Sequence, residues 1–402
     1  MEIGVALGKD KFSRTSRYDA LFLSYDTFVP ALRGLIALGY VEETRKGFND
    51  PRTGIGRVTR VRATPKLVAL LTGAAMNLAK VSHRTDGSEI IVLRGNDKED
   101  VEYRDNELTR QMRSELERIN RTLSAHWLDL FISDTEMMRL NAKMAGRHEK
   151  DERVPQRIDL TARRLRRIFN NRDWNQGGRF YGGWWQTIPK EYRTHITIDG
   201  KHTVEIDYSG MHPVLLYAEA GIKLDTELDV YNIGKPNVPR HIIKRAFNKL
   251  VNASGRTVAT PDFDEQQFGL SWSELVKLVR EKNEPIAQFL AAGHGLHLQS
   301  KDAKIANRIM LRFLDRGYVC LPVHDSFIVH HGLQNELEQI MRDEFRAAVG
   351  TDVAMKTKFD VISAGVFYKD DDTDLANPLG SLSGKFAGHE VRVANWFSSR
   401  GS

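Results

Sequence analysis

The sequence predicts an α+β protein, because strand-like and helix-like patterns both occur along the whole chain. Residues 41–45, 58–62 and 204–208 alternate apolar and polar side chains with the period of a strand. Before and after these strands, apolar residues recur at helical spacing, as over 25–38 and 335–349. With 402 residues, 41% of them hydrophobic and 28% charged, the chain can form two or three domains with their own cores.

Composition excludes several classes of protein. No apolar run approaches the roughly 18 residues of a membrane-spanning helix, and residues 1–3 open no signal peptide. The single cysteine, Cys320, rules out an intrachain disulfide and a zinc ribbon. We therefore expect a cytoplasmic protein with no membrane partner. Its net charge of +6 fits a nucleic-acid partner without requiring one.

Residues 1–83 are the first predicted domain. A helix over 25–38 precedes the strands 41–45 and 58–62, and Thr64-Pro65 begins another helix. The loop between the strands contains glycine, proline and several cations, which indicates a basic hairpin. Helix, strand, basic hairpin, strand, helix is the order of a winged helix-turn-helix, although such a fold can also serve only in protein packing.

This domain resembles bacterial winged-helix regulators of the MarR type. The resemblance rests on Leu32-x-x-Leu35-x-x-x-Gly39-Tyr40-Val41-Glu42, Asp50-Pro51-Arg52-x-Gly54 and Ala63-Thr64-Pro65-Lys66-Leu67. Such wings place arginines on DNA phosphates or in the minor groove. The resemblance therefore implies that Arg45 and Arg52 contact nucleic acid.

Residues 84–157 are predicted to be a connecting segment with one strand, 89–93, followed by a thumb-like helical part. From Asn106 to Met144 apolar residues recur at helical spacing, which predicts one long amphipathic helix. Its charges are expected to form a solvated face.

Residues 158–369 are predicted to be the largest domain. A basic helix over 159–170, N-capped by Asp159, leads into the stretch 177–189, where glycines alternate with aromatic residues. Glycines let a backbone approach a ligand closely, and aromatic rings offer stacking faces. Arg179 in this stretch can hold a phosphate through two hydrogen bonds.

Two aspartates in this domain lie at strand ends. Asp207 closes the strand 204–208 before a Ser-Gly turn and a helix that begins near Pro213. Residues 318–330 read as two strands with Asp325 at their turn. An isolated aspartate at a turn is ordinarily a turn former, but a pair of them can hold a cation.

A cationic helix follows the first aspartate. Pro239 can start it, and Arg240 and Lys244 are four residues apart, on one helical face. This face could bind a triphosphate, and a solvated basic helix is the alternative. Further helices are expected over 271–283, 284–291 and 293–313, and residues 370–402 are expected to be a polar tail.

Taken in order, these pieces resemble the family A polymerases, which include bacterial repair-type DNA polymerases and single-subunit phage and mitochondrial RNA polymerases. The resemblance runs from about Arg163 to Val349. It rests on Gly178-Arg179 with Gln186-x-Ile188-Pro189-x-x-x-Arg193, Asp207-Tyr208-Ser209, Arg240-x-x-x-Lys244, Leu298-Gln299-Ser300 with Ala303, and Val323-His324-Asp325-Ser326-Phe327. It implies a right-hand polymerase palm with reduced fingers, preceded by the winged helix and the helical segment.

The resemblance also implies roles for single residues. Asp207, Asp325 and Lys244 would be catalytic, and Asp207, Asp325 and the Tyr208 carbonyl would hold two Mg²⁺ ions, with Mn²⁺ as a substitute. The incoming nucleotide would meet Arg240, Lys244, His212, Asn248 and Asn252. The nucleic acid would meet Arg179, Gln186, Gln299 and His324.

The chain departs from the family pattern at two positions that affect sugar choice. His212 stands where the DNA polymerases have a glutamate that blocks the ribose 2′-OH, and Asn252 stands where an aromatic residue is usual. We predict a template-directed DNA polymerase of plasmid or phage type, acting on a DNA template, a primer and dNTPs. A primase or RNA polymerase using NTPs, a terminal transferase, and a non-enzymatic winged-helix initiator or regulator are the alternatives; the oligomeric state is left open.

Overall fold

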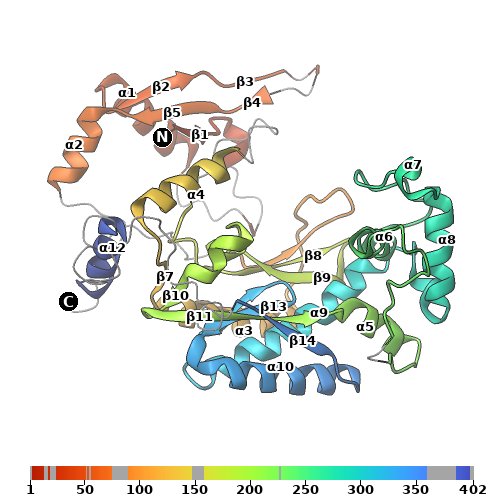
Figure 1. Ribbon diagram of the computed structural model, residues 1–402. Helices are drawn as coiled ribbons and strands as arrows, with labels where there is room; N and C mark the ends of the chain where they lie inside the picture. Colours follow the sequence, from red (N-terminus) through yellow and green to blue (C-terminus); the bar gives the residue numbers. More distant parts are fainter. Residues whose placement is uncertain are drawn as a thin grey trace.

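The computed structural model describes residues 2–12, 17–18, 24–50, 52–53, 56–74, 89–146, 158–225, 228–359 and 386–398. Helices and strands run throughout these residues, which confirms the mixed helix-and-sheet class (Figure 1). In the part of the chain that is described, no helix is both long and apolar enough to span a membrane.

The N-terminal unit joins a small sheet to two helices. Its elements are β1 (Glu2–Val5), a 3₁₀ turn (Lys9–Phe12), α1 (Tyr25–Ala37), β2 (Val41–Arg45), β3 (Phe48–Asn49), β4 (Gly56–Arg57), β5 (Thr59–Ala63) and α2 (Pro65–Gly73). The sheet order is β1-β5-β2, and the short β3 and β4 pair at the tip of the β2–β5 hairpin. Leu32, Val41 and Val61 form its small core. The helix and strand order predicted for residues 25–73 is therefore present.

The region predicted as one helix from Asn106 to Met144 consists of three elements, so that prediction was wrong. They are α3 (Glu107–Ala125), β7 (Leu128–Leu130) and α4 (Asp134–Gly146). β7 interrupts the helix because its three residues pair with β10 (Ile196–Ile198) and are completely buried. Tertiary pairing over so short a strand outweighs the helical periodicity on both sides.

The prediction of a helix over 159–170 was also wrong. Asp159 accepts hydrogen bonds from the backbone N–H and hydroxyl of Thr161, at 2.9 and 2.6 Å, and so forms a local turn instead of a helix cap. The chain then enters β8 (Arg166–Asn170) and returns in β9 (Asp173–Tyr181). With the preceding β6 (Ile91–Leu93), these strands form a three-stranded sheet in the order β6-β8-β9.

The central sheet brings together strands from distant parts of the chain. Its order is β12-β13-β11-β10-β7, and β14 also pairs with β11. The strands not yet bounded are β11 (Lys201–Ser209), β12 (Leu321–Val323), β13 (Ser326–His330) and β14 (Ala354–Phe359). β11 is the pivotal strand, because β13 pairs along one edge while β10 and β14 share the other.

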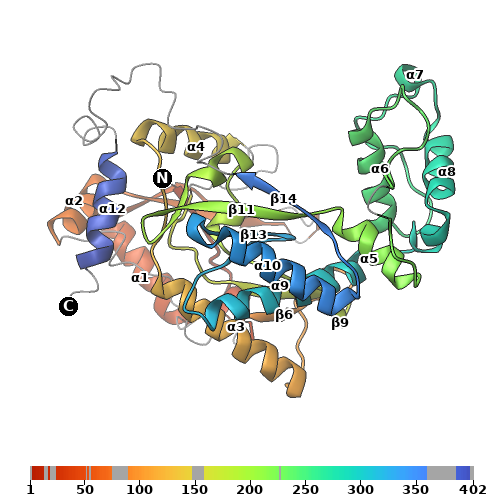
Figure 2. The same cartoon turned by 60° about the horizontal axis from the view of Figure 1, so that its bottom comes forward.

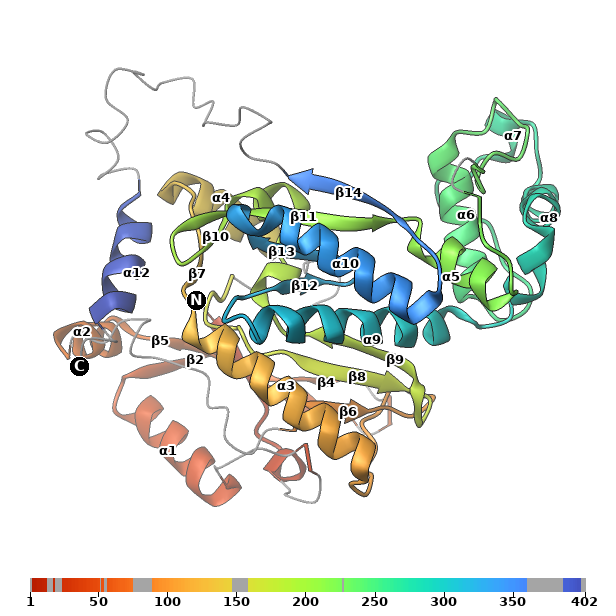
Figure 3. The same cartoon turned by 90° about the horizontal axis from the view of Figure 1, so that it is seen from below.

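Two long helices pack beside these sheets. They are α9 (Gly295–Leu314) and α10 (Gln334–Val349). α9 lies along β9 on one side and contacts α10 on the other, as Figure 3 shows. α3 packs on α9 from outside, so α9 is the buried centre of the helical layer.

A separate lobe projects beyond α5 (Met211–Glu219), at the right of Figures 1 and 2. It contains α6 (Arg240–Asn252), α7 (Glu265–Phe268), α8 (Trp272–Lys282) and a 3₁₀ helix (Glu284–Phe289). The residues predicted as a helix over 284–291 thus form a shorter 3₁₀ turn. Other 3₁₀ turns cover Trp184–Gln186, Lys190–His195 and His331–Leu333.

The end of the chain is not only a polar tail. Residues 387–398 form α12 (Ala387–Ser398), which packs near α4 at the β7 edge of the central sheet (Figure 3). Its His389 and Arg392 contact the completely buried Asp129 of β7 at 2.8 and 2.9 Å. The acidic run 370–372 lies outside the described residues.

Candidate active site

Two aspartates that are far apart in the sequence lie on neighbouring strands of the central sheet. Asp207, near the end of β11, pairs with Ser326, the first residue of β13. Asp325 immediately precedes Ser326, and its carbonyl oxygen accepts a hydrogen bond from the backbone N–H of Tyr208 at 3.4 Å. Both aspartates are partly exposed. The β11–β13 register therefore places the backbones of the two aspartates beside each other at one end of the sheet.

The turn that carries Asp325 has an uncommon backbone conformation. Val323 pairs with Ser326, so His324 and Asp325 form a two-residue turn, and His324 has a φ of +60°. A non-glycine residue in this left-handed region costs about 1–3 kcal/mol. Although His324 is exposed as a whole, desolvation of its imidazole and the nearby Arg179 lower its pKa, so the ring is neutral at pH 7. The ring lies 6.2 Å from that of Tyr181.

A third carboxylate, Glu205, is buried behind this pair. It lies two residues before Asp207, on the same face of β11. The hydroxyl of Ser326 donates to its Oε1 at 2.7 Å, and Arg193 forms an ion pair with the same oxygen at 3.2 Å. Because Glu205 is only 2% exposed, this network fixes Ser326, the residue between Asp325 and the rest of β13. Glu205 was not predicted as a site residue, although its spacing of two from Asp207 in the strand pattern places both on one face of β11.

Arg179 is held by a buried carboxylate from α9. Its Nε lies 3.1 and 3.0 Å from the two oxygens of Asp302, and its Nη2 also contacts Asp302. His212 joins the cluster, with its Nε2 3.4 Å from Arg179 and 3.5 Å from Asp302. Burial alone would lower the pKa of Arg179, but Asp302 and the field of Asp325 outweigh it and raise the pKa. Arg179 is thus a fixed cation whose charge reaches the carboxylate pair.

The glycine and aromatic run is explained by packing within the chain. A Cβ on Gly178 would lie 2.5 Å from the ring of Phe169, and one on Gly183 would lie 2.3 Å from the ring of Trp185. Trp184 and Trp185 are buried, as is Phe180. These three rings therefore cannot stack on nucleic-acid bases, contrary to what the sequence had suggested. The glycines instead leave space for the protein's own aromatic side chains.

Gln186 is hydrogen-bonded within the protein, whereas Gln299 is partly exposed on a helix. The Gln186 amide donates to the carbonyl oxygens of Phe180 and Pro322 at 2.9 and 3.0 Å, while its oxygen accepts from the Gly183 N–H. Gln186 therefore connects the turn after β9 to β12, next to the hairpin of Asp325. Gln299 lies partly exposed on α9, three residues before Asp302.

β14 adds a cation that no sequence pattern indicated. Lys356 stands directly opposite Asp207 in the β11–β14 pairing and is exposed. Directly opposed residues have Cβ atoms about 4.5–5.5 Å apart on one face, so an ammonium group lies within reach of this carboxylate. Tyr208, by contrast, turns its side chain into the core, where its hydroxyl donates to the carbonyl of Met341. Only the main-chain atoms of Tyr208 therefore lie near Asp207 and Asp325.

The predicted cationic face exists on α6, in the projecting lobe. Arg240, Lys244, Asn248 and Asn252 are spaced by four and are all exposed. Arg240 is engaged by Asp229, with Nε 2.9 Å from Oδ2, whereas Asn252 lies against Gly295, the first residue of α9. The C-terminal end of α6 therefore meets the helix that carries Asp302, and its N-terminal end points away from it.

The two arginines of the hairpin that were predicted to contact nucleic acid are exposed. Arg45 ends β2, and Arg52 follows the β3 strand in the hairpin tip, where its backbone N–H donates to Asp50 at 2.9 Å. Arg57 lies over the ring of Phe48 at 4.9 Å and also belongs to the tip. The tip thus presents cations and one exposed aromatic ring away from the small core.

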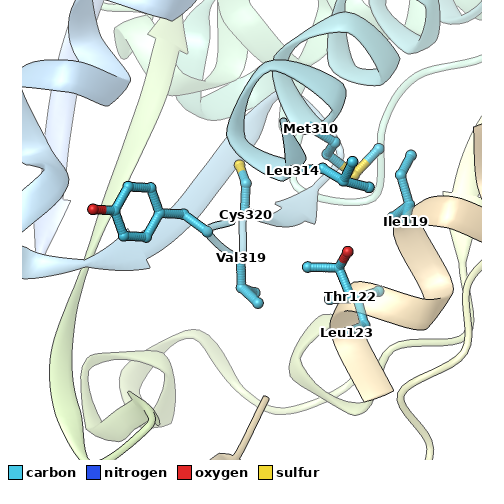
Figure 4. Close-up of a pocket in the computed structure, with 8 residues that line it drawn as sticks. Ile119, Thr122, Leu123, Met310, Leu314, Val319 and Cys320 are labelled. Atoms are coloured by element: carbon cyan, nitrogen blue, oxygen red, sulfur yellow. The ribbon is translucent and has the colours of Figure 1, made fainter. Parts of the chain in front are cut away.

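Two cavities lined by described residues both lie away from the aspartates. One, of about 10 Å³, is lined by Ile119, Thr122, Leu123, Met310, Leu314, Tyr318, Val319 and Cys320 (Figure 4). It has room for roughly one water molecule, so it is a packing gap between α3, α9 and the segment that leads into β12. The other, of about 440 Å³, is an open hollow of the projecting lobe between Arg256, Trp272 and Arg280.

Comparison with known proteins gives little. No family model matches the chain, and no curated protein matches it. Among solved structures, it is similar to the POL domain of Pol1 from M. smegmatis in complex with DNA primer-template and dNTP, with 15% identity and a TM-score of 0.33. The match covers 56% of this chain and 50% of that chain. The chain therefore spans about half of that domain, and a TM-score this low does not establish a shared fold.

Proposed function

We propose that this chain is a Mg²⁺-dependent, template-directed nucleic-acid polymerase of the family A kind. The observation that carries this proposal is the β11–β13 register, which sets Asp207 beside the turn that holds Asp325. Two partly exposed carboxylates at one sheet end, with a fixed arginine behind them, are the groups that nucleotidyl transfer uses. The resemblance of the surrounding motifs to family A polymerases supports the same conclusion.

The donor set fits Mg²⁺. Asp207 and Asp325 offer hard oxygen ligands on a partly exposed surface, where the ion can keep several waters. Glu205, bonded to Arg193 and Ser326, is occupied and would support the pair from behind. When bound there, Mg²⁺ would activate a primer 3′-OH and neutralise charge on the leaving pyrophosphate.

The chain's own cations would bind the nucleotide. Lys244 is exposed on α6, and Arg240 would have to exchange Asp229 for a phosphate. Lys356 opposite Asp207 provides a further positive charge beside the carboxylates. The α6 lobe would have to close toward the sheet for these groups to act together, as mobile lobes do in many enzymes.

DNA synthesis is favoured over RNA synthesis by the placement of His212. Its ring contacts Arg179 and Asp302 and sits in the first turn of α5, five residues after Asp207. A bulky ring held by two partners is suited to crowd a ribose 2′-OH. The nearest alternative, a primase or RNA polymerase, is supported by the His-Asp-Ser-Phe sequence of the hairpin and by the missing glutamate.

One experiment distinguishes these two polymerases. Extension of a labelled primer on a heteropolymeric DNA template is followed with dNTPs or NTPs, alongside an unprimed template. We expect extension with dNTPs at least tenfold faster than with NTPs, and a smaller ratio in the His212→Ala variant. Extension with NTPs alone, or initiation without a primer, would move the assignment to the alternative.

The wing gives the proposed enzyme a way to reach DNA. Arg45, Arg52 and Arg57 are exposed on one hairpin, as in winged helices that contact the phosphate backbone. The same hairpin also supports a second candidate, a non-enzymatic DNA-binding initiator or regulator. Specific DNA binding with no incorporation by the unaltered chain, in Mg²⁺ or Mn²⁺, would favour that candidate. Incorporation that ignores a homopolymer template would indicate terminal transfer instead.

A further inference from the structure

A second cluster of ligand-type side chains lies away from the two aspartates. Glu219 at the end of α5 meets His294 and His297 at the start of α9, and one ligand atom from each lies within 4.8 Å of the others. Throughout the described ranges, no other group of three His, Cys, Asp or Glu side chains has ligand atoms this close. The three residues come from two helices, so the cluster joins separate elements.

Short contacts hold this cluster together. His294 Nε2 lies 2.6 Å from Glu219 Oε2, and the His294 and His297 rings are 5.0 Å apart. The Glu219 side chain is 13% exposed and that of His294 is 22% exposed. The imidazole of His297 is also partly buried, next to that of His294.

We propose that Glu219, His294 and His297 bind a divalent first-row transition ion such as Zn²⁺. Two imidazoles and one carboxylate are a usual three-ligand set for Zn²⁺, with water in the fourth position. The ion would replace the proton between Glu219 and His294. Tetrahedral ligands at about 2.0–2.1 Å lie roughly 3.3 Å from one another, so this pair must separate slightly while His297 moves in. Mg²⁺ is a poor fit, because it prefers oxygen ligands.

Lys301 sets the strength of this site. Its Nζ forms an ion pair with the other oxygen of Glu219 at 2.7 Å, and its side chain is 39% exposed. The ammonium neutralises the carboxylate and opposes a nearby cation, so it weakens the metal site. Removing Lys301 should therefore strengthen binding, an effect opposite to that of removing a ligand.

A bound ion would cross-link two helices that flank the sheet. α5 follows the strand that carries Asp207, and α9 carries Asp302, the partner of Arg179. The role inferred is structural: the ion would hold the base of the projecting lobe. This proposal does not depend on the proposed polymerase activity, since binding can be measured without nucleotide or DNA.

The test uses the full chain, purified without a polyhistidine tag and stripped with EDTA. Zn²⁺ retention after dialysis is measured by mass spectrometry, and affinity by calorimetry. We expect one Zn²⁺ per chain, a loss of at least tenfold in affinity in Glu219→Gln, His294→Ala and His297→Ala, and a gain of about threefold or more in Lys301→Ala. His241→Ala, which removes an exposed histidine of α6, is the matched control and should bind as the unaltered chain does.

Co²⁺ provides a second readout on the unaltered chain, in case a variant fails to fold. Tetrahedral Co²⁺ with two imidazole ligands should give a visible absorption band that one equivalent of Zn²⁺ removes. Absence of that band, equal Zn²⁺ retention by the ligand variants, or no stoichiometric Zn²⁺ would overturn the proposal.

Discussion

Breaking the Arg179–Asp302 pair tests whether Arg179 is a cation fixed by a buried charge. The Asp302 side chain is 1% exposed and that of Arg179 is 16% exposed, so solvent screens little of this pair. Removing one member of a buried ion pair costs about 3–5 kcal/mol of the free energy of unfolding, because the other charge stays buried. Arg179→Ala leaves the deeper charge of Asp302 with His212, at 3.5 Å, as its remaining ion-pair partner among the described residues. We therefore expect a loss of about 4 kcal/mol for Arg179→Ala and about 3 kcal/mol for Asp302→Ala.

The double variant Arg179→Met with Asp302→Leu is the decisive comparison. Replacing both charges by apolar groups of similar volume is often neutral or stabilising. We expect its free energy of unfolding to lie within about 1 kcal/mol of that of the unaltered chain. Urea unfolding at pH 7, followed by tryptophan fluorescence, measures all three, since Trp184 and Trp185 are buried near this site. If the double variant were as unstable as Asp302→Ala, the cost would come from lost packing and not from an unpaired charge.

Three further predictions follow from other contacts. Ending the chain at residue 385 removes α12 and leaves Asp129, which is 0% exposed, without His389 and Arg392. Urea unfolding should show that the free energy of unfolding falls by about 3 kcal/mol or more. An unchanged unfolding midpoint would show that α12 does not stabilise Asp129. Burial raises the pKa of the Cys320 thiol, so a thiol reagent at pH 8 should label it only in urea, and rapid labelling of the folded chain would refute that burial. Lys356→Ala should raise the KM for dNTPs several-fold in primer extension, whereas Lys356→Arg, which keeps the positive charge, should have a KM close to that of the unaltered chain. If the KM of Lys356→Ala equalled that of Lys356→Arg, Lys356 would not belong to the nucleotide site.

The parts of the fold that the sequence predicted correctly are those governed by local signals. The helix after Ser24 has a side-chain cap, with Ser24 accepting from Thr27 at 3.2 Å. The strands around the basic hairpin and the turn at His324-Asp325 have turn residues at their ends. Each of these depends on residues that are close in the sequence.

The errors come from pairings between distant segments. β7 has three residues, too few for a periodic signal, and exists because β10 pairs with it. β8 begins with arginines and has good helix formers before it, yet it lies between β6 and β9. Both are cases in which tertiary contacts override propensity.

In the candidate site, too, local signals predicted some residues, whereas others depend on long-range contacts. The positions of Asp207 and Asp325 followed from strand ends, but Asp302 is 123 residues from Arg179 and has no local feature that marks it as its partner. Glu205 and Lys356 became visible only through the registers of β11 with β13 and β14. The cluster of Glu219 with His294 and His297 likewise depends on how α5 and α9 meet.

The most direct test of the polymerase assignment is Mg²⁺-dependent nucleotide incorporation on a primed template by matched aspartate variants. We expect incorporation by the unaltered chain, and a loss of at least a hundredfold in Asp207→Ala and in Asp325→Ala with DNA affinity nearly unchanged. Asp315→Ala removes an exposed aspartate that pairs with Arg118 at the surface, and it should retain full activity. Incorporation that survives in Asp207→Ala and Asp325→Ala would refute the polymerase assignment, as would the absence of incorporation by the unaltered chain.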